Sequence, residues 1–156
     1  MALSACQSVE EVATPNVTNA PASGYSSLKT GSEEDFILNV GRRIYFTAGS
    51  STLDSTAKVT LDSQAAWLNK NPSWKVKLQG FSDDPGDAAA NLALSQKRAD
   101  AAMNYIISKG VASDRLWAKG YGKERIVRDC PDISCKSQNR RVIANLRESV
   151  EEWARR

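Results

Sequence analysis

Residues 79–110 read QGFSDDPGDAAANLALSQKRADAAMNYIISKG and join a strand to a long helix through a tight polar loop. Residues 74–80 alternate apolar and polar side chains, which is the period of a half-buried strand. Residues 82–87 are rich in Asp, Pro and Gly, which favour turns. Apolar side chains then recur at helical spacing from about residue 88 to residue 108, and Gly110 is typical of the position after a helix end. The stretch predicts a strand, a loop and a helix in direct succession.

Two charged side chains in this stretch form a candidate binding site. Asp83 follows the strand, and Arg98 lies further along the helix. Asn91 and Ser95 share one helix stripe with Arg98 because the three stand at i, i+4 and i+7. A carboxylate binds an ammonium, and a planar guanidinium binds a carboxylate through two parallel bonds. The pair predicts a site for a small zwitterion, and the structural alternative is an ordinary turn Asp and a solvated Arg.

The two long helices each have a predicted core stripe. The first begins with Asp54 or Ser55 as its N-cap, runs to about Asn69 and stops at Asn71-Pro72. Its inward residues are expected to be Ala57, Leu61, Ala65 and Leu68. The second helix is expected to bury Leu92, Ala99, Met103 and Ile106, a stripe of ordinary core residues rather than a cofactor site.

Shorter elements complete the predicted order of helix, strand, helix, strand, helix, strand, strand. A short helix begins at Ser32 and ends at Gly41. The other expected elements are strands over 43–46, 116–121 and 140–146, a loop over 123–138 and a short terminal helix or tail over 148–156. Strands that alternate with long helices indicate an α/β (α+β) two-layer sandwich, with helices on one face of the sheet.

Composition limits the range of functions. The 156 residues suit one domain, 33–147, and a tail. The 21 basic and 18 acidic residues give a net charge of only +3, which does not favour nucleic acid as a partner. The sequence contains no apolar run long enough for a transmembrane helix. It also contains no His, the commonest general base and metal ligand, so we expect neither catalysis nor a metal or other cofactor.

Residues 1–32 are predicted to be a flexible tether. They are rich in Ser, Thr, Asn, Pro and Ala and bury too little apolar surface to order themselves. The opening Leu3-Ser4-Ala5-Cys6 resembles a bacterial lipobox, in which the Cys is acylated; a stray Cys in a tail is the alternative. Only five residues precede Cys6, so we expect most of a signal peptide to be missing from this chain. A coil of this length spans about 30 Å r.m.s..

Five pieces of sequence, in order, resemble the OmpA-like peptidoglycan-binding domain family and, within it, the branch of peptidoglycan-associated lipoproteins. They are IYFTAGSSTLD, GFSDDPG, NLALSQKRA, GVASDRLWAKGYGKE and SQNRRV, and they lie between about Arg43 and Leu146. The resemblance implies a mixed four-stranded sheet with a βαβαββ order. It also implies a non-catalytic anchor that binds the diaminopimelate residue of peptidoglycan stem peptides. Asp83 would bind its ammonium and Arg98 its distal carboxylate.

The resemblance also gives supporting contacts to neighbours of this pair: Phe46, Thr47, Ser82, Asn91, Leu94, Asn139 and Arg140. Asn91 would donate to a stem-peptide carbonyl or simply cap its helix. One of Arg140 and Arg141 would face the site, and the other would be a solvated charge. Asp84 and Pro85 replace the acidic and basic residues expected after Asp83 in this branch.

Location and partners are likewise implied by the resemblance. The chain would be lipid-anchored through Cys6 on the periplasmic face of the outer membrane of a Gram-negative bacterium. It would bind diaminopimelate-type peptidoglycan and belong to the Tol-Pal system, with TolB as its protein partner. Cys130 and Cys135 would form a small loop disulfide in the oxidising periplasm, with two free thiols as the alternative.

Three competing readings remain. Asp83 and Asp84 can be read as the paired carboxylates of a cell-wall hydrolase, but adjacent acids in one turn point apart, and a short polar loop is hard to desolvate. The chain can also be another family member, such as a porin-linked or motor-linked anchor. Finally, loop 82–87 can be a plain turn that binds nothing.

Overall fold

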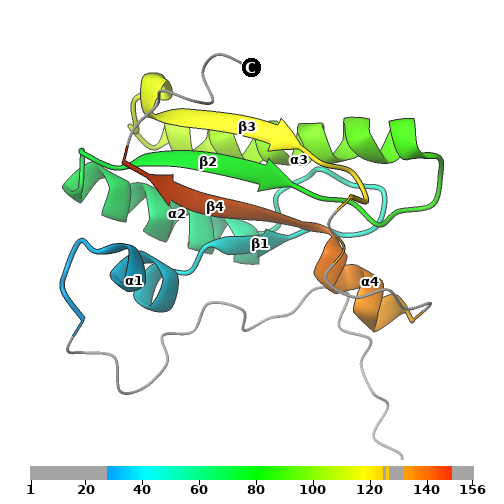
Figure 1. The fold of residues 1–156 in the computed structure, drawn as a ribbon, viewed down its shortest axis with the longest axis horizontal. Helices are drawn as coiled ribbons and strands as arrows, with labels where there is room; N and C mark the ends of the chain where they lie inside the picture. Colours follow the sequence, from blue (N-terminus) through cyan, green and yellow to red (C-terminus); the bar gives the residue numbers. More distant parts are fainter. Residues whose placement is uncertain (1–27, 125, 127–131, 149–156) are drawn as a thin grey trace, which may run out of the picture.

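A mixed four-stranded sheet is the centre of the fold (Figure 1). The computed structural model describes residues 28–124, 126 and 132–148. The strands are β1 (Arg43–Tyr45), β2 (Lys75–Gly80), β3 (Leu116–Gly120) and β4 (Arg141–Arg147), in the spatial order β1-β4-β2-β3. β2 and β3 are parallel, whereas β4 is antiparallel to both β1 and β2. The mixed sheet expected from the sequence is confirmed.

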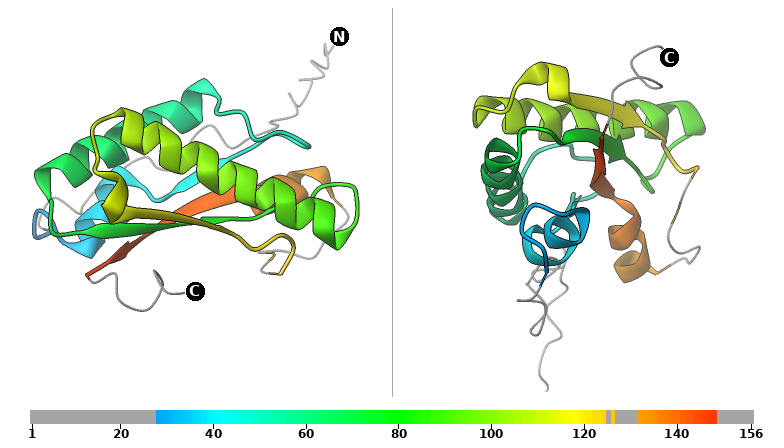
Figure 2. Two further views of the ribbon diagram at one scale, coloured as in Figure 1. Left: turned by 90° about the horizontal axis from the view of Figure 1, so that it is seen from above. Right: turned by 60° about the vertical axis from the view of Figure 1, so that its left-hand side comes forward.

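Two long helices cover one face of this sheet. α2 (Ser55–Lys70) contacts β1, and α3 (Ala88–Ser108) contacts β2 and β3. Figure 1 looks onto the opposite face, with the strands in front of both helices, and the left view of Figure 2 shows α3 beside β2 and β3. The shorter helices are α1 (Glu33–Asp35), which continues as a π-helical turn (Phe36–Val40), a 3-10 turn (Ser113–Arg115) and α4 (Ile133–Asn139).

Side-chain caps fix where the helices begin. The Asp54 carboxylate accepts a hydrogen bond from the Ala57 amide at 2.7 Å, so Asp54 rather than Ser55 is the N-cap of α2. Asp87 caps α3 in the same way, with the Ala90 amide as donor at 2.7 Å. Each cap satisfies one backbone amide that has no partner inside its helix. The first turn of α3 is thereby held beside the loop that precedes it.

The core lies between the sheet and the helices. The four core residues predicted for α2, namely Ala57, Leu61, Ala65 and Leu68, are all buried. In α3 the prediction for Leu92 is wrong, because its side chain is 49% exposed. The buried stripe of α3 begins instead with the polar residues Asn91, Ser95 and Arg98 and continues into Ala102 and Ile106. Leu92 lies one residue off this stripe and therefore faces away from the sheet.

Two strand-end glycines bring α3 unusually close to the sheet. A Cβ atom at Gly80 would collide with the backbone oxygen of Ser95, and one at Gly120 would collide with the backbone nitrogen of Gln96. The absence of side chains at these positions lets the polar half of α3 lie directly on β2 and β3. The same close approach carries Arg98 to the end of the sheet.

The loop predicted over residues 123–138 contains a helix that the prediction missed. α4 occupies residues 133–139, lies where β4 begins (Figure 1), and starts with Asp132 accepting backbone hydrogen bonds from Cys135 and Lys136. Cys135 is buried and disulfide-bonded. Cys130 lies outside the described residues, as do the expected lipidation site Cys6 and the tail beyond Glu148. Among the described residues, no helix has the length and apolarity needed to cross a bilayer.

Candidate functional site

Arg98 is the centre of the candidate site, and its side chain is completely buried, with an exposed fraction of 0%. Its Nε donates to the backbone oxygen of Ser50 at 2.8 Å. Its terminal nitrogens donate to the backbone oxygens of Phe81 at 3.2 Å and of Thr47 at 3.1 Å. The same two nitrogens also donate to the two carboxylate oxygens of Asp84, at 2.8 and 3.3 Å. A guanidinium has five N–H groups, and these five bonds use all of them.

Asp84 is the carboxylate partner of Arg98. It is 4% exposed, and it also accepts a hydrogen bond from the backbone amide of Gly49. Burial alone would raise the pKa of Asp84, but the bonds from Arg98 and Gly49 and the positive charge of nearby Arg140 hold that pKa below its usual value. Asp84 is therefore ionised at neutral pH, and the two side chains form a buried, forked ion pair.

Asp83, the predicted ammonium acceptor, lies next to this pair and points elsewhere. Its carboxylate accepts a hydrogen bond from the Asn139 amide at 2.8 Å, and its side chain is half-buried. Arg140 donates through Nε to the backbone oxygen of Phe46 at 3.1 Å. Burial lowers the pKa of Arg140, which lies close enough to Asp84, Arg98 and Asp83 for their charges to act on it. Two carboxylates and two guanidiniums thus meet at this end of the sheet.

Asn91 holds the loop that carries both carboxylates. Its side chain accepts from the Asp84 amide at 3.0 Å and donates to the Asp84 backbone oxygen at 3.1 Å. The Ser82 hydroxyl donates to the backbone oxygen of Asn91 at 2.8 Å. Asn91 is 1% exposed and does not cap α3, since that role belongs to Asp87. Its amide braces the loop from inside the protein.

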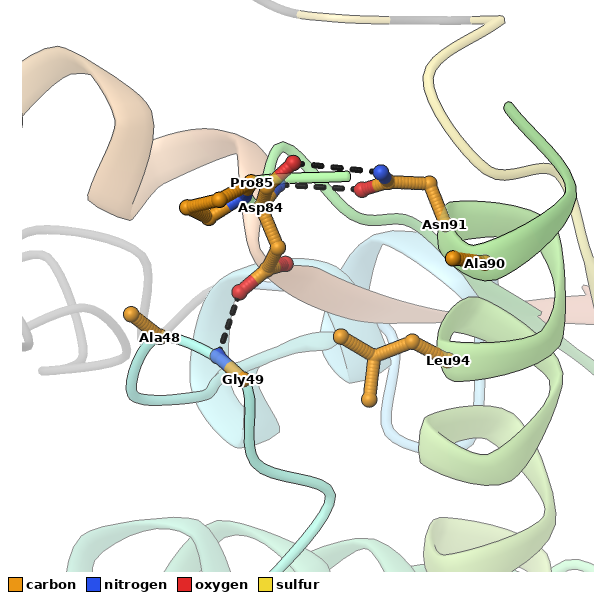
Figure 3. A pocket seen from close by; sticks show the side chains of 7 residues that line it. All are labelled: Ala48, Gly49, Asp84, Pro85, Ala90, Asn91 and Leu94. Carbon is orange, nitrogen blue, oxygen red and sulfur yellow. Dashed lines mark hydrogen bonds between the residues drawn. The ribbon is translucent and has the colours of Figure 1, made fainter. Parts of the chain in front are cut away.

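A cavity of about 400 Å³ opens beside the ion pair (Figure 3). It lies between the loop after β1, the loop after β2 and the first two turns of α3. Figure 3 shows the Asp84 carboxylate at its wall, bonded to Gly49, with Leu94 across from it. The lining residues are Ala48, Gly49, Asp84, Pro85, Ala90, Asn91 and Leu94. This arrangement suits a small ligand with an apolar stem and a charged end.

The structure brings most of the predicted site residues together. Arg98 donates to the backbone oxygen of Thr47, and Arg140 donates to that of Phe46. The Ser82 hydroxyl donates to the backbone oxygen of Asn91, and Leu94 lines the cavity. Asp83 does not line it, and the direct ion-pair partner of Arg98 is Asp84. The prediction gave Asp84 no role in binding, although strand periodicity contained the signal. Continuing the inward alternation of Leu78 and Gly80 through Ser82 places Asp84 inside and Asp83 outside.

The prediction that Arg140 or Arg141 is solvated is wrong. Both are buried, and Arg141 is only 5% exposed, with its guanidinium 4.1 Å from the centre of the Phe81 ring. The aromatic face stabilises the cation. Asp84 is also buried, contrary to the expectation that a short polar loop is hard to desolvate.

Comparison with known proteins gives consistent results. The model of the OmpA family matches residues 45–140. The chain is 42% identical to the peptidoglycan-associated lipoprotein of Mesorhizobium japonicum over 147 residues, covering 94% of this chain and 86% of that protein. It is 40% identical to the protein of the same name from Rhizobium meliloti, covering 94% and 82%.

Solved structures share the fold. The crystal structure of the peptidoglycan-associated lipoprotein from Burkholderia pseudomallei has a TM-score of 0.69 and 28% sequence identity, covering 73% of this chain and 98% of that chain. The C-terminal domain of Helicobacter pylori MotB has a TM-score of 0.64 at 19% identity, covering 72% and 89%, and at that identity only the fold is comparable.

Proposed function

This chain belongs to the OmpA family, and we propose that it binds peptidoglycan without catalysis, through the diaminopimelate residue of the stem peptide. The observation that carries the proposal is the buried Arg98 beside an open cavity, with Asp83 and Asp84 on the adjoining loop. The distal end of meso-diaminopimelate carries an ammonium and a carboxylate on one carbon. In the proposal Asp83 binds the ammonium and Arg98 the carboxylate.

The supporting contacts assigned by resemblance divide into two groups in this proposal. Leu94 contacts the apolar stem of the ligand from the cavity wall. Phe46, Thr47, Ser82, Asn91, Asn139 and Arg140 position the two loops and the charged groups through the internal bonds described above. Their substitution is therefore expected to weaken binding through the geometry of the site.

We further propose that the chain anchors the outer membrane to the cell wall from its periplasmic face. The name shared by its relatives, peptidoglycan-associated lipoprotein, supports a lipid-anchored protein that associates with the cell wall. Acylation of Cys6 would supply the anchor, and the residues between Cys6 and α1 the tether. In this proposal the chain belongs to the Tol-Pal system of a Gram-negative bacterium and has TolB as its protein partner. A disulfide between Cys130 and Cys135 would form in the same oxidising periplasm.

A hydrolase is the weaker candidate. A glycosidase needs one carboxyl group with a raised pKa to act as a general acid. Here the pKa of Asp84 is lowered, and its carboxylate is bound to Arg98. Asp83 points away from it toward Asn139. A porin-linked or motor-linked anchor remains the second candidate because those domains share the fold.

Co-sedimentation with purified sacculi tests the proposal. The wild type is expected to pellet with diaminopimelate-type sacculi and to remain soluble with lysine-type sacculi, which lack the distal carboxylate. Asp83→Asn is expected to reduce pelleting at least about tenfold, because it removes the charge that pairs with the ammonium. Asp114→Asn, an exposed substitution on the turn before β3, is the matched control and should pellet like the wild type. Equal pelleting with both kinds of sacculi would contradict the proposal.

A further inference from the structure

Arg98 has no free donor for a ligand in this structure. Three of its N–H groups bind backbone oxygens of Ser50, Phe81 and Thr47, and the other two bind Asp84. The three backbone bonds lock the guanidinium in place, because their acceptors belong to the main chain. The two N–H groups that face Asp84 are the only ones bound to a side chain that can turn away. A ligand carboxylate can reach Arg98 only by replacing Asp84.

We propose that Asp84 is an internal competitor for Arg98 and thereby sets the specificity of the site. This inference rests on the proposed function. When the ligand binds, its carboxylate takes the two N–H groups that Asp84 held. The released Asp84 then pairs with the ammonium of the same ligand, which also lies near Asp83, and the net charge of the site stays unchanged because the ligand end carries one charge of each sign. The site exchanges one carboxylate for another, and the ligand must bring both charges for the exchange to be balanced.

The surroundings of Asp84 favour a turn of its side chain rather than a movement of its loop. Both backbone groups of Asp84 are bonded to the Asn91 side chain, which is itself buried. The carboxylate, in contrast, borders the cavity of about 400 Å³ (Figure 3). Rotation about the side-chain bonds of Asp84 would therefore carry the carboxylate from Arg98 into the space where the ligand binds. Within the described part of the chain, the one further bond of the carboxylate that must break is the bond from the Gly49 amide.

Charge balance explains why a ligand with a single charge is rejected. A ligand that has the carboxylate but no ammonium would take the guanidinium from Asp84, which is 4% exposed in this structure, and would give it no cation in exchange, which is unfavourable. A ligand that has only the ammonium, such as a lysine side chain, cannot replace Asp84 on Arg98. It would have to share Asp84 with a guanidinium that already holds it. Selection therefore depends on the two charges acting together.

The first test uses the wild-type protein and four synthetic tripeptides that differ only at the third residue. The side-chain end carries both charges in meso-diaminopimelate, the carboxylate alone in 2-aminopimelate, the ammonium alone in lysine and neither in norleucine. Binding is measured by isothermal titration calorimetry. We expect removal of either charge to weaken binding nearly as much as removal of both. If the loss of affinity on removing both charges equals the product of the two separate losses, Asp84 does not couple the charges and the inference is wrong.

The second test uses Asp84→Asn, which removes the competing charge but keeps the shape of the side chain. The preference is the ratio of the dissociation constants of the 2-aminopimelate and diaminopimelate tripeptides, and we expect this ratio to be at least about tenfold smaller in the variant than in the wild type. Asp114→Asn is again the matched control and should keep the wild-type preference. An unchanged preference in a folded Asp84→Asn protein would overturn the inference.

The two proposals fail in different ways. If the wild type binds neither sacculi nor any of the four tripeptides, the proposed function itself is wrong. If the wild type binds the diaminopimelate tripeptide but its two charges act independently, only the role of Asp84 is wrong. Because the tripeptide series needs no substitution, this distinction holds even if Asp84→Asn fails to fold.

Discussion

At the scale of single residues, the site is a buried charge cluster that has a structural role besides its proposed role in binding. Arg98 ties together three backbone segments, at Thr47, Ser50 and Phe81, as well as holding Asp84. A buried ion pair is costly to form, and removing one partner is costlier still, because the other charge stays buried without compensation. Arg98 is therefore needed for the fold of the two loops before it can act on a ligand.

Arg98→Met is expected to lower the free energy of unfolding by about 3–5 kcal/mol, because it leaves Asp84 and three backbone oxygens without their donor. Urea denaturation followed by circular dichroism measures the loss. The exposed neighbour Lys97 offers a matched control, since Lys97→Met should change stability by no more than about 0.5 kcal/mol. Similar effects for the two substitutions would show that the ion pair is not a structural element.

The free energy of unfolding is expected to fall in acid, because Asp84 must be protonated there. Its pKa in the folded protein lies below the ordinary value of 3.8, so the folded state holds this proton less tightly than the unfolded state. The stabilisation is complete above about pH 4 and is lost as the pH falls through the lower, folded-state pKa. Asp35 acts in the same sense, because bonds from Trp67, Asn39 and Gly31 outweigh the burial that would raise its pKa.

The comparison that checks this is the pH dependence of unfolding in the wild type and in Asp84→Asn. The wild type should lose stability more steeply between about pH 4 and pH 2 than the variant, which has no carboxylate to protonate at this position. Parallel curves for the two proteins would mean that Asp84 is not held ionised by Arg98.

At the scale of elements, the position of α3 on the sheet determines where the site residues lie. Gly80 and Gly120 allow the helix backbone to approach the strand ends, and the stripe from Asn91 to Arg98 then faces the loops after β1 and β2. Asp87 fixes the first turn of the helix, next to the loop that carries Asp83 and Asp84.

Gly80→Ala should therefore weaken both the fold and the site. The added Cβ meets backbone atoms of Ser95, which cannot move aside as a flexible side chain would. We expect a loss of about 1–3 kcal/mol in the free energy of unfolding. We also expect weaker binding to diaminopimelate-type sacculi, because the helix that carries Arg98 must shift. A variant as stable as the wild type, with equal binding, would show that this close approach is unimportant.

The elements themselves could largely be predicted from the sequence, because their signals are local. Helical spacing indicated α2 and α3, the cap at Asp54 or Ser55 indicated where α2 begins, and alternation indicated β2. α4 was missed because its seven residues show too short a pattern to separate a helix from a loop. Leu92 was misplaced because an apolar residue was assumed to face the core, whereas the sheet end beside it is filled by polar residues.

At the scale of the whole molecule, the site exists because the sheet order brings distant segments to one edge. β4 lies between β1 and β2 and runs antiparallel to both, so the ends of β1 and β2 meet the beginning of β4. Backbone bonds from Phe46 to Arg140 and from Phe81 to Arg141 continue the pairing beyond the strands. Arg140 and Phe46, which are 94 positions apart in the sequence, are therefore hydrogen-bonded at this end of the sheet, beside the cavity between the loops after β1 and β2.

This long-range assembly limits what the sequence alone predicts about the site. Arg98 and the loop at Asp83 were identified from motifs, because motif residues lie close together in the chain. The choice of Asp84 as the partner of Arg98 depends on three-dimensional direction, and the contribution of Gly49 depends on the folding of the loop after β1 against it. Strand alternation indicates that Asp84 points inward, but its pairing with Arg98 and Gly49 follows only from the packing of α3 and of the loop after β1.

The most direct test of the account is an NMR titration of the ¹⁵N-labelled wild-type protein with the tripeptide L-Ala-D-Glu-meso-diaminopimelate. Amide signals of Ala48, Gly49, Asp83, Asp84 and Leu94 are expected to shift together and to saturate, since these residues surround the cavity or hold the charges of the proposed site. The lysine tripeptide at the same concentration should leave them nearly unchanged. Shifts confined to the open face of the sheet, for example at Lys77 and Trp117, or equal shifts with both tripeptides, would contradict it.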